Sequence, residues 1–230
     1  MCGRFALKKA HLAQVARQAA AIVAGTAPAA SRYNIPPGVR IPVVRNRADG
    51  ARELVDLHWG LRPAWAGPAA RPVSNARAET AADKPAFRDA IRRRRCLIPA
   101  TAFYEWTTGG GERLPWAFFS PDGEPLCLGG LWEDDSCAVV TTAANAVMSP
   151  VHHRMPVLLT PADHDAWLDP RSDFSTTPSR SALAVLLNPA PDDRLVARRV
   201  STRVNAVRND DESCLTETTE EPDAQLELGW

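Results

Sequence analysis

The chain has 230 residues, enough for one domain of about 150 residues with an extension, or for one larger domain. Hydrophobic residues make up 45% of the chain and charged residues 23%, which is typical of globular proteins in water. No run reaches the roughly 20 apolar residues of a membrane-spanning helix, and the start lacks the apolar stretch of a secretory signal. Five cysteines without a CxxC pair argue against a disulfide framework, so we expect a soluble, cytoplasmic protein.

Charge is distributed unevenly along the chain. The formal net charge is zero, yet eight acidic residues and no Lys or Arg follow Arg208, so residues 1–208 carry a net charge of +8. A basic body with an acidic end is typical of a polyanion-binding domain, although it also serves solubility alone. We expect one domain over residues 1–208 and an acidic, disordered tail over residues 209–230.

The first half of the chain alternates helical and strand patterns. Leu12, Val15, Ala19 and Ile22 have helical spacing, and Gly25 is placed to end that helix. Alternating apolar residues over 55–59 predict a half-buried strand, and a second helix is expected over 83–95.

Short β-type runs dominate the second half. They are separated by turn signals and cover residues 96–98, 102–106, 116–119, 126–132 and 137–141. Thr160 followed by Pro161 predicts the start of another helix, and residues 183–187 and 195–200 predict two further strands. We therefore expect an α+β fold: a single domain with a largely antiparallel, barrel-like β core flanked by helices. Four tryptophans are assigned to its core: Trp59, Trp116, Trp132 and Trp167.

Cys2 is the first residue that suggests chemistry. Aminopeptidases remove an initiator methionine before a small second residue, which would leave the Cys2 thiol beside a free α-amine. Such an amine is partly neutral at pH 7, and the thiolate is a strong nucleophile. Together they convert an aldehyde to an imine and then to a five-membered thiazolidine. A buried structural cysteine is the equally weighted alternative.

Two enzyme classes carry an N-terminal Cys followed by Gly. In class II glutamine amidotransferases the thiol attacks an amide, and those enzymes usually carry a later Asn-Gly pair for the oxyanion. Arg4 follows Gly3 here and no Asn-Gly occurs, so an N-terminal-nucleophile amidohydrolase is the weaker alternative. A non-enzymatic single-strand DNA-binding module is a further alternative.

Motifs along nearly the whole body point to one family. They include Met-Cys-Gly-Arg-Phe at 1–5, Tyr-Asn-Ile-Pro-Pro-Gly at 33–38, Trp-Gly-Leu-Arg-Pro-Ala-Trp-Ala at 59–66, Asn-Ala-Arg-Ala-Glu-Thr at 75–80, Phe-Tyr-Glu-Trp at 103–106, Gly-Leu-Trp-Glu at 130–133, His-His-Arg-Met-Pro-Val at 152–157 and Val-Asn at 204–205. In this order they resemble the SRAP (SOS-response-associated peptidase) family, whose members covalently trap abasic sites in single-stranded DNA.

The resemblance implies catalytic roles for four residues. Cys2 would capture the sugar aldehyde after removal of Met1. The resemblance implies that this removal is autoproteolytic, although a host aminopeptidase is the simpler explanation. Glu105 resembles the acid–base carboxylate, because expelling water from a carbinolamine needs a nearby proton donor. His152 would assist ring opening and reversal, with His153 as the competing assignment, and Asn75 would orient the amine or a sugar oxygen. Weak abasic-site lyase activity would follow where the sulfur fails to close.

DNA contacts are expected from arginines and tryptophans. The guanidinium groups of Arg4, Arg77 and Arg154 suit phosphate oxygens. Trp106 and Trp65 offer flat faces for stacking or for wedging between strands. The run of arginines at 92–95 has two equally weighted interpretations: it binds DNA phosphates, or it is the solvated end of a helix, where positive charge complements the helix dipole.

Other partners follow from what the sequence contains and lacks. Cys127, Cys137, His152 and His153 have no compact ligand spacing and no phosphate-binding loop motif occurs, so we expect neither a metal nor a cofactor. The last six residues, from Gln225 to Trp230, resemble the short peptides with which bacterial proteins dock on the sliding clamp. Single-stranded DNA with an abasic site is the expected partner of a monomer without membrane contact.

Overall fold

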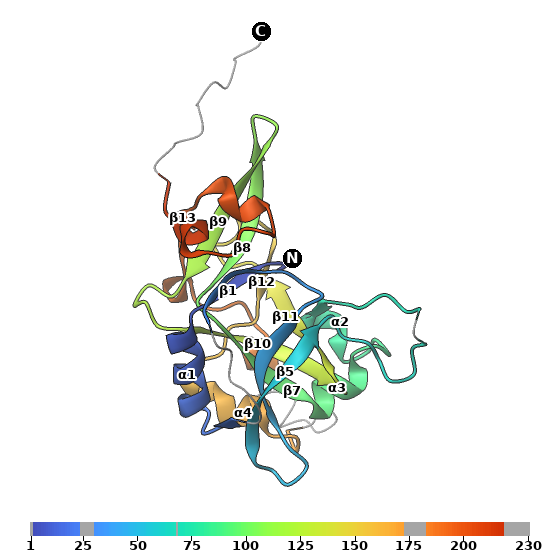
Figure 1. Ribbon diagram of the computed structural model, residues 1–230. Helices are drawn as coiled ribbons and strands as arrows, with labels where there is room; N and C mark the ends of the chain where they lie inside the picture. The colour runs from blue at the N-terminus through green and yellow to red at the C-terminus, as the bar shows by residue number, and fades with distance from the viewer. Residues whose placement is uncertain (1, 24–29, 68, 173–182, 219–230) are drawn as a thin grey trace.

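The computed structural model describes residues 2–23, 30–67, 69–172 and 183–218 (Figure 1). Its strands are β1 (Phe5–Leu7), β2 (Ile22–Val23), β3 (Arg32–Ile35), β4 (Arg40–Asn46), β5 (Arg52–Trp59), β6 (Asn75–Arg77), β7 (Arg95–Ala100), β8 (Ala102–Gly109), β9 (Glu112–Phe119), β10 (Leu126–Glu133), β11 (Ser136–Ala143), β12 (Arg154–Pro156) and β13 (Val196–Arg199). Its α-helices are α1 (Lys9–Gln18), α2 (Ala78–Ala81), α3 (Arg88–Arg93) and α4 (His164–Leu168), and its 3₁₀ helices are η1 (Pro161–Asp163), η2 (Asp192–Arg194), η3 (Thr202–Asn205) and η4 (Glu212–Leu215).

The larger sheet has eight strands and forms the core of the molecule. Its order is β12-β11-β10-β7-β4-β5-β2, with β6 paired to β11. A parallel pairing of β11 with β5, Ser136 opposite His58, closes the strands β5, β4, β7, β10 and β11 into a ring. Short helices lie around this ring, as Figure 1 shows, so the α+β prediction is confirmed.

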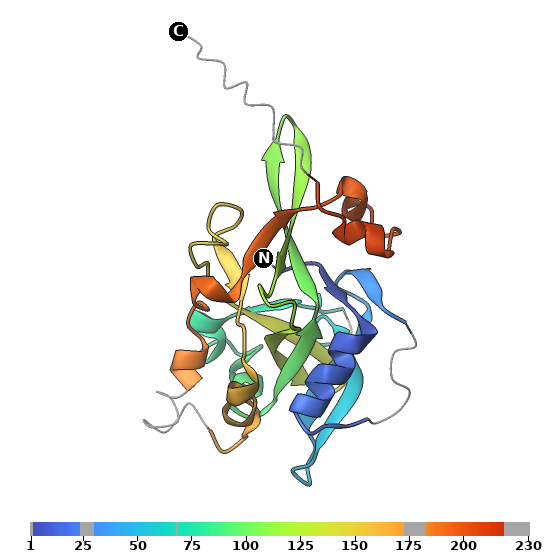
Figure 2. The same cartoon turned by 90° about the vertical axis from the view of Figure 1, so that its left-hand side faces the viewer.

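The smaller sheet positions the N-terminal residues. Its order is β13-β9-β8-β1-β3, and all of its pairings are antiparallel. The β8–β9 hairpin extends beyond the rest of the body at one end of the molecule, and the β4–β5 hairpin lies at the other end (Figures 1 and 2). Both views also place β12 close to the start of β1.

Local sequence patterns explain several of these elements. The apolar face of α1 buries Leu12, Val15 and Ala16 in the main core, as its spacing predicted. Thr160 begins η1 with a reciprocal capping box, in which its side chain and that of Asp163 each accept a backbone N–H. The four tryptophans assigned to the core are buried or partly buried in it: Trp59, Trp116, Trp132 and Trp167.

Two predicted elements differ in the structure. Ile22 does not continue the face of α1, because the helix ends at Gln18 and Ile22 lies 61% exposed in β2. Residues 183–186 are helical and not a strand. The reason is their spacing: Leu183, Leu186 and Leu187 all pack on the main core, which positions i, i+3 and i+4 do in a helix.

The prediction of a disordered tail is wrong for residues 209–218, which are folded onto the body of the protein. The Asp210 carboxylate accepts the backbone N–H of Tyr33 at 2.5 Å and of Asn34 at 2.8 Å, and it forms an ion pair with Arg32. Cys214 is fully buried in a second, smaller apolar cluster, against which Leu215 also packs. An acidic side chain at 210 thus holds the chain end onto β3. The predicted clamp-binding peptide, Gln225 to Trp230, lies outside the described residues.

The described part of the chain contains no helix that is long and apolar enough to cross a membrane.

Candidate functional site

Cys2 and Glu105 lie next to each other because β1 pairs with β8. Phe5 is opposite Phe103, and the Tyr104 amide donates to the Arg4 carbonyl oxygen at 2.9 Å. The residues before Arg4 therefore continue alongside Glu105. Cys2 is 1% exposed and Glu105 is 6% exposed, so both reactive side chains lie in a sheltered site.

Burial changes the protonation of both groups. It raises the pKa of the Glu105 carboxyl above its ordinary value. Burial also raises the pKa of the Cys2 thiol, and the negative charge of Glu105 raises it further. The thiol is therefore held neutral, and the carboxyl is shifted towards the protonated form that can donate a proton.

His152 has a defined proton position. Its Nδ1 accepts the backbone N–H of Arg154 at 2.9 Å, while the Arg154 carbonyl oxygen lies farther away at 3.3 Å. Since a backbone amide can only donate, the neutral ring carries its proton on Nε2. Burial lowers the pKa of His152, which favours this neutral donor form. His153 is exposed and stacks on His152 with ring centroids 4.4 Å apart.

Asn75 and Arg77 lie on the same face of β6. The parallel pairing with β11 places Asn75 opposite Val139 and Arg77 opposite Thr141. The Asn75 amide nitrogen donates to the Ser74 hydroxyl at 3.2 Å, whereas its buried Oδ1 accepts no hydrogen bond within the described chain. Arg77 is exposed. The pair presents an acceptor and a cation at the edge of β11.

The structure gives the Arg154 guanidinium partners within the protein, and its phosphate-binding role stays a prediction. Its guanidinium donates to both Glu79 oxygens, at 2.5 and 2.9 Å, and to the Thr141 carbonyl oxygen at 2.6 Å. The side chain is only 11% exposed. Arg154 therefore joins β12 to β11 and α2.

Trp106 and Trp65 lie in different surroundings. The Trp106 indole N–H donates to Asn205 Oδ1 at 2.6 Å, and its ring lies beneath the guanidinium groups of Arg4 and Arg113. Trp65 is 70% exposed in the segment between β5 and β6. Base stacking remains a prediction for both rings, and at Trp106 two cations already occupy positions over the ring.

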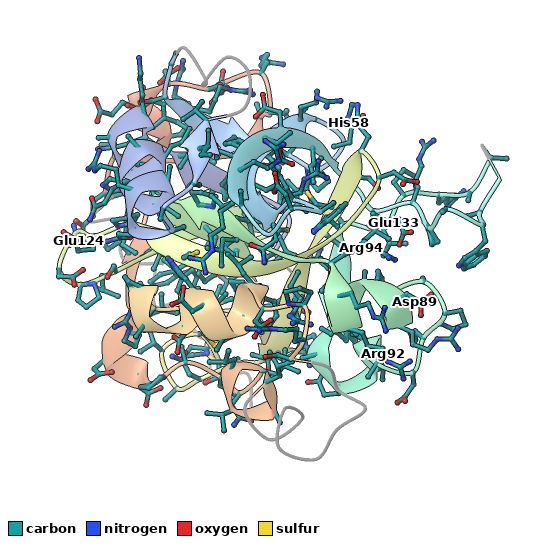
Figure 3. All side chains as sticks on the ribbon, turned by 90° about the horizontal axis from the view of Figure 1, so that it is seen from below. His58, Asp89, Arg92, Arg94, Glu124 and Glu133 are labelled. Atoms are coloured by element: carbon teal, nitrogen blue, oxygen red, sulfur yellow. The ribbon has the colours of Figure 1, made fainter. Side chains whose placement is uncertain are left out.

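The arginine run at 92–95 serves the fold. Arg95 is buried, and its guanidinium donates to the carbonyl oxygens of Ile91, Arg92, Trp167 and Asp169. Arg94 forms an ion pair with Glu133 at 2.7 Å, and the two lie side by side in Figure 3. Arg95 thus satisfies carbonyl oxygens at the end of α3, as one of the two readings of this run predicted.

Sequence reasoning missed three residues around the site. Glu79 and Asn205 belong to motifs that carried the family resemblance, but neither had an assigned role. Arg113 lies in a turn-rich stretch with no motif, and only the β8–β9 pairing brings it to Trp106.

Comparison with known proteins agrees with these motifs. The family model for SOS response associated peptidase (SRAP) matches residues 1–207. The abasic site processing protein YoqW of Bacillus subtilis is 34% identical over 189 residues, which cover 77% of this chain and 82% of YoqW. The abasic site processing protein HMCES of Gallus gallus is 29% identical over 224 residues, covering 80% of this chain and 65% of HMCES.

Solved structures give the same result. A protein from Bordetella bronchiseptica superposes with a TM-score of 0.71 at 28% identity, covering 87% of this chain and 100% of that protein. A protein from Bacteroides thetaiotaomicron gives a TM-score of 0.68 at 25% identity, over 81% and 85% of the two chains. The family match spans most of the chain and includes every residue of the site built above, and the chain belongs to the SOS response associated peptidase (SRAP) family.

Proposed function

We propose that the protein processes abasic sites in single-stranded DNA and forms a reversible thiazolidine cross-link through Cys2. Relatives named abasic site processing proteins support the substrate class. The observation that carries the chemistry is the placement of the buried Cys2 thiol beside the buried Glu105 carboxyl.

Glu105 handles the proton at both steps. After loss of Met1, the Cys2 amine adds to C1′ of the ring-opened sugar and gives a carbinolamine. Protonated Glu105 donates to the departing hydroxyl, so water leaves and an iminium ion forms. The Cys2 sulfur then bonds to the same carbon, and the thiol proton returns to the Glu105 carboxylate. The carboxyl thus ends in the state in which it began.

His152 and Asn75 act on the sugar and the amine. The Nε2–H of neutral His152 donates a hydrogen bond to a sugar oxygen, which eases ring opening and, in reverse, release of the adduct. The Asn75 Oδ1, which is buried and has no hydrogen-bond partner within the described chain, accepts a hydrogen bond from the amine or from a sugar hydroxyl. Arg77, exposed at the same edge, binds a neighbouring phosphate. An iminium ion that sulfur does not capture allows β-elimination, which gives weak lyase activity.

A denaturing gel tests this proposal directly. The wild-type protein, incubated with an oligonucleotide that contains one abasic site, should give a shifted band without any reductant. Cys2→Ser keeps the amine but loses the sulfur, so it should give a band only after borohydride reduces the imine. Cys214→Ser is the matched control, because its hydroxyl can still donate to the Asn209 carbonyl oxygen as the Cys214 thiol does at 3.4 Å. An undiminished, reductant-independent band with Cys2→Ser, or active protein that retains Met1 by mass spectrometry, would exclude the mechanism.

A further inference from the structure

The Trp106 ring carries two guanidinium groups. The Arg113 Cζ lies 4.7 Å from the ring centroid and the Arg4 Cζ lies 5.7 Å from it. Both are distances at which a cation is attracted by an indole face. Arg113 is exposed at the β8–β9 hairpin, and Arg4 is half-buried just before β1. One ring therefore gathers cations from two separate parts of the chain.

Hydrogen bonds fix the ring and one of the arginines. Asn205 accepts the Trp106 indole N–H at 2.6 Å and donates to the Arg113 carbonyl oxygen at 2.9 Å. Arg4 donates from one terminal nitrogen to Asn34 Oδ1 at 2.6 Å and to the Val204 carbonyl oxygen at 3.2 Å. The site is therefore organised before any ligand arrives.

No carboxylate of the described chain pairs directly with these two cations, although the charge of Arg113 partly offsets the rise in the pKa of Glu105. Within the described chain neither Arg4 nor Arg113 forms an ion pair with a carboxylate, whereas exposed arginines such as Arg40, Arg171 and Arg203 do. Burial lowers the pKa of Arg4, and the nearby charge of Arg113 lowers it further. Two like charges held close together favour an anion that can accept from both.

We propose that Arg4 and Arg113, held over Trp106, form a binding site for a phosphodiester group of the DNA strand next to the abasic sugar. The inference rests on the proposed function for the position of that sugar. Glu105 and Trp106 are consecutive in β8, so their side chains point to opposite faces of the strand. The abasic sugar then lies at Cys2 and Glu105 on one face of β8, and the neighbouring phosphate lies at Arg4 and Arg113 on the other face.

The site can be tested without covalent chemistry. An oligonucleotide with a tetrahydrofuran in place of the abasic sugar has no aldehyde, so fluorescence anisotropy measures binding alone as salt is increased. Arg113→Ala should weaken binding several-fold and should reduce the slope of log K against log salt by about 0.7, the value for one phosphate contact in single strands. Arg113→Lys should restore the slope.

Arg47→Ala is the matched control. Arg47 lies in the β4–β5 hairpin at the opposite end of the molecule, with a half-exposed side chain beside Asp49, and its loss should leave both affinity and slope unchanged. An Arg113→Ala slope equal to that of wild type would overturn the phosphate site. If wild type binds this oligonucleotide with the Arg113-dependent slope but never cross-links to abasic DNA, the proposed chemistry fails while the phosphate site stands.

Discussion

Replacing Arg154 with alanine separates a structural role from a DNA-binding role. The substitution removes a side chain that is 11% exposed and that joins Glu79 to the fully buried Thr141. If Arg154 mainly holds β12 to β11 and α2, the variant loses stability first. If the arginine binds phosphate, as its motif suggested, the variant loses DNA affinity and keeps its stability.

The expected loss of stability follows from the hydrogen bonds of Arg154 to Glu79 and to Thr141. The Glu79 side chain is 50% exposed and can be rehydrated, so its share is that of a surface pair, about 1 kcal/mol or less. The Thr141 carbonyl oxygen is left buried without its charged donor, which costs about 1–3 kcal/mol. A total of about 3 kcal/mol corresponds to a fall in Tm of roughly 6–12 °C for a chain of this length.

Thermal and urea unfolding followed by circular dichroism measure this loss. Arg171→Ala is the control, because Arg171 also binds both oxygens of an aspartate, Asp169, but its own side chain is 89% exposed. That variant should unfold within experimental error of wild type. An Arg154→Ala protein with unchanged Tm and lost DNA binding would refute the structural role.

The ion pair between Arg154 and Glu79 also predicts how the stability of the protein depends on pH. The hydrogen bond from Arg154 lowers the pKa of Glu79 below its ordinary value of 4.5. The ionised Glu79 carboxylate therefore stabilises the folded state above pH 4.5, and this contribution is lost as pH falls through the lowered pKa of Glu79 in the folded state. Arg154→Ala should lose that part of the acid dependence, as should Glu79→Gln.

Two further predictions concern buried titratable groups. Burial raises the pKa of Glu105, so ionisation of this carboxyl lowers the stability of the folded state as pH rises through its folded-state pKa. Glu105→Gln should therefore raise Tm at pH 8 but not below pH 4.5, and it should slow cross-linking. An equal gain in Tm at both pH values would contradict this explanation. His164 is 1% exposed, and neither ring nitrogen has a hydrogen-bond partner within the described chain. Burial lowers the pKa of His164, so below about pH 6.5 the unfolded chain binds a proton that the folded chain does not, and stability should fall by at most about 1.4 kcal/mol per pH unit. His164→Leu should reduce that slope in denaturant titrations between pH 5 and 7, and an unchanged slope would show that other groups cause it.

Local sequence signals were sufficient for much of the fold. The spacing of Leu12 and Val15 predicted the buried face of α1, and Thr160 predicted a capped helix start, because these patterns act over one or two helical turns. The order of motifs around Cys2, Glu105 and His152 likewise indicated the family without any coordinates.

Tertiary structure decided which partners the charged residues have. Arg154 and Arg4 look equally suited to phosphate in the sequence, yet only the pairing of β11 with β12 and β6 brings Thr141 and Glu79 to Arg154. Arg4, by contrast, meets Arg113 over Trp106 and no carboxylate within the described chain. In the same way Asp210 looked like part of a solvated acidic run until β3 presented two backbone N–H groups to it. A charge is visible in the sequence, but whether it is satisfied by the protein or left for a ligand depends on residues that are distant in the chain.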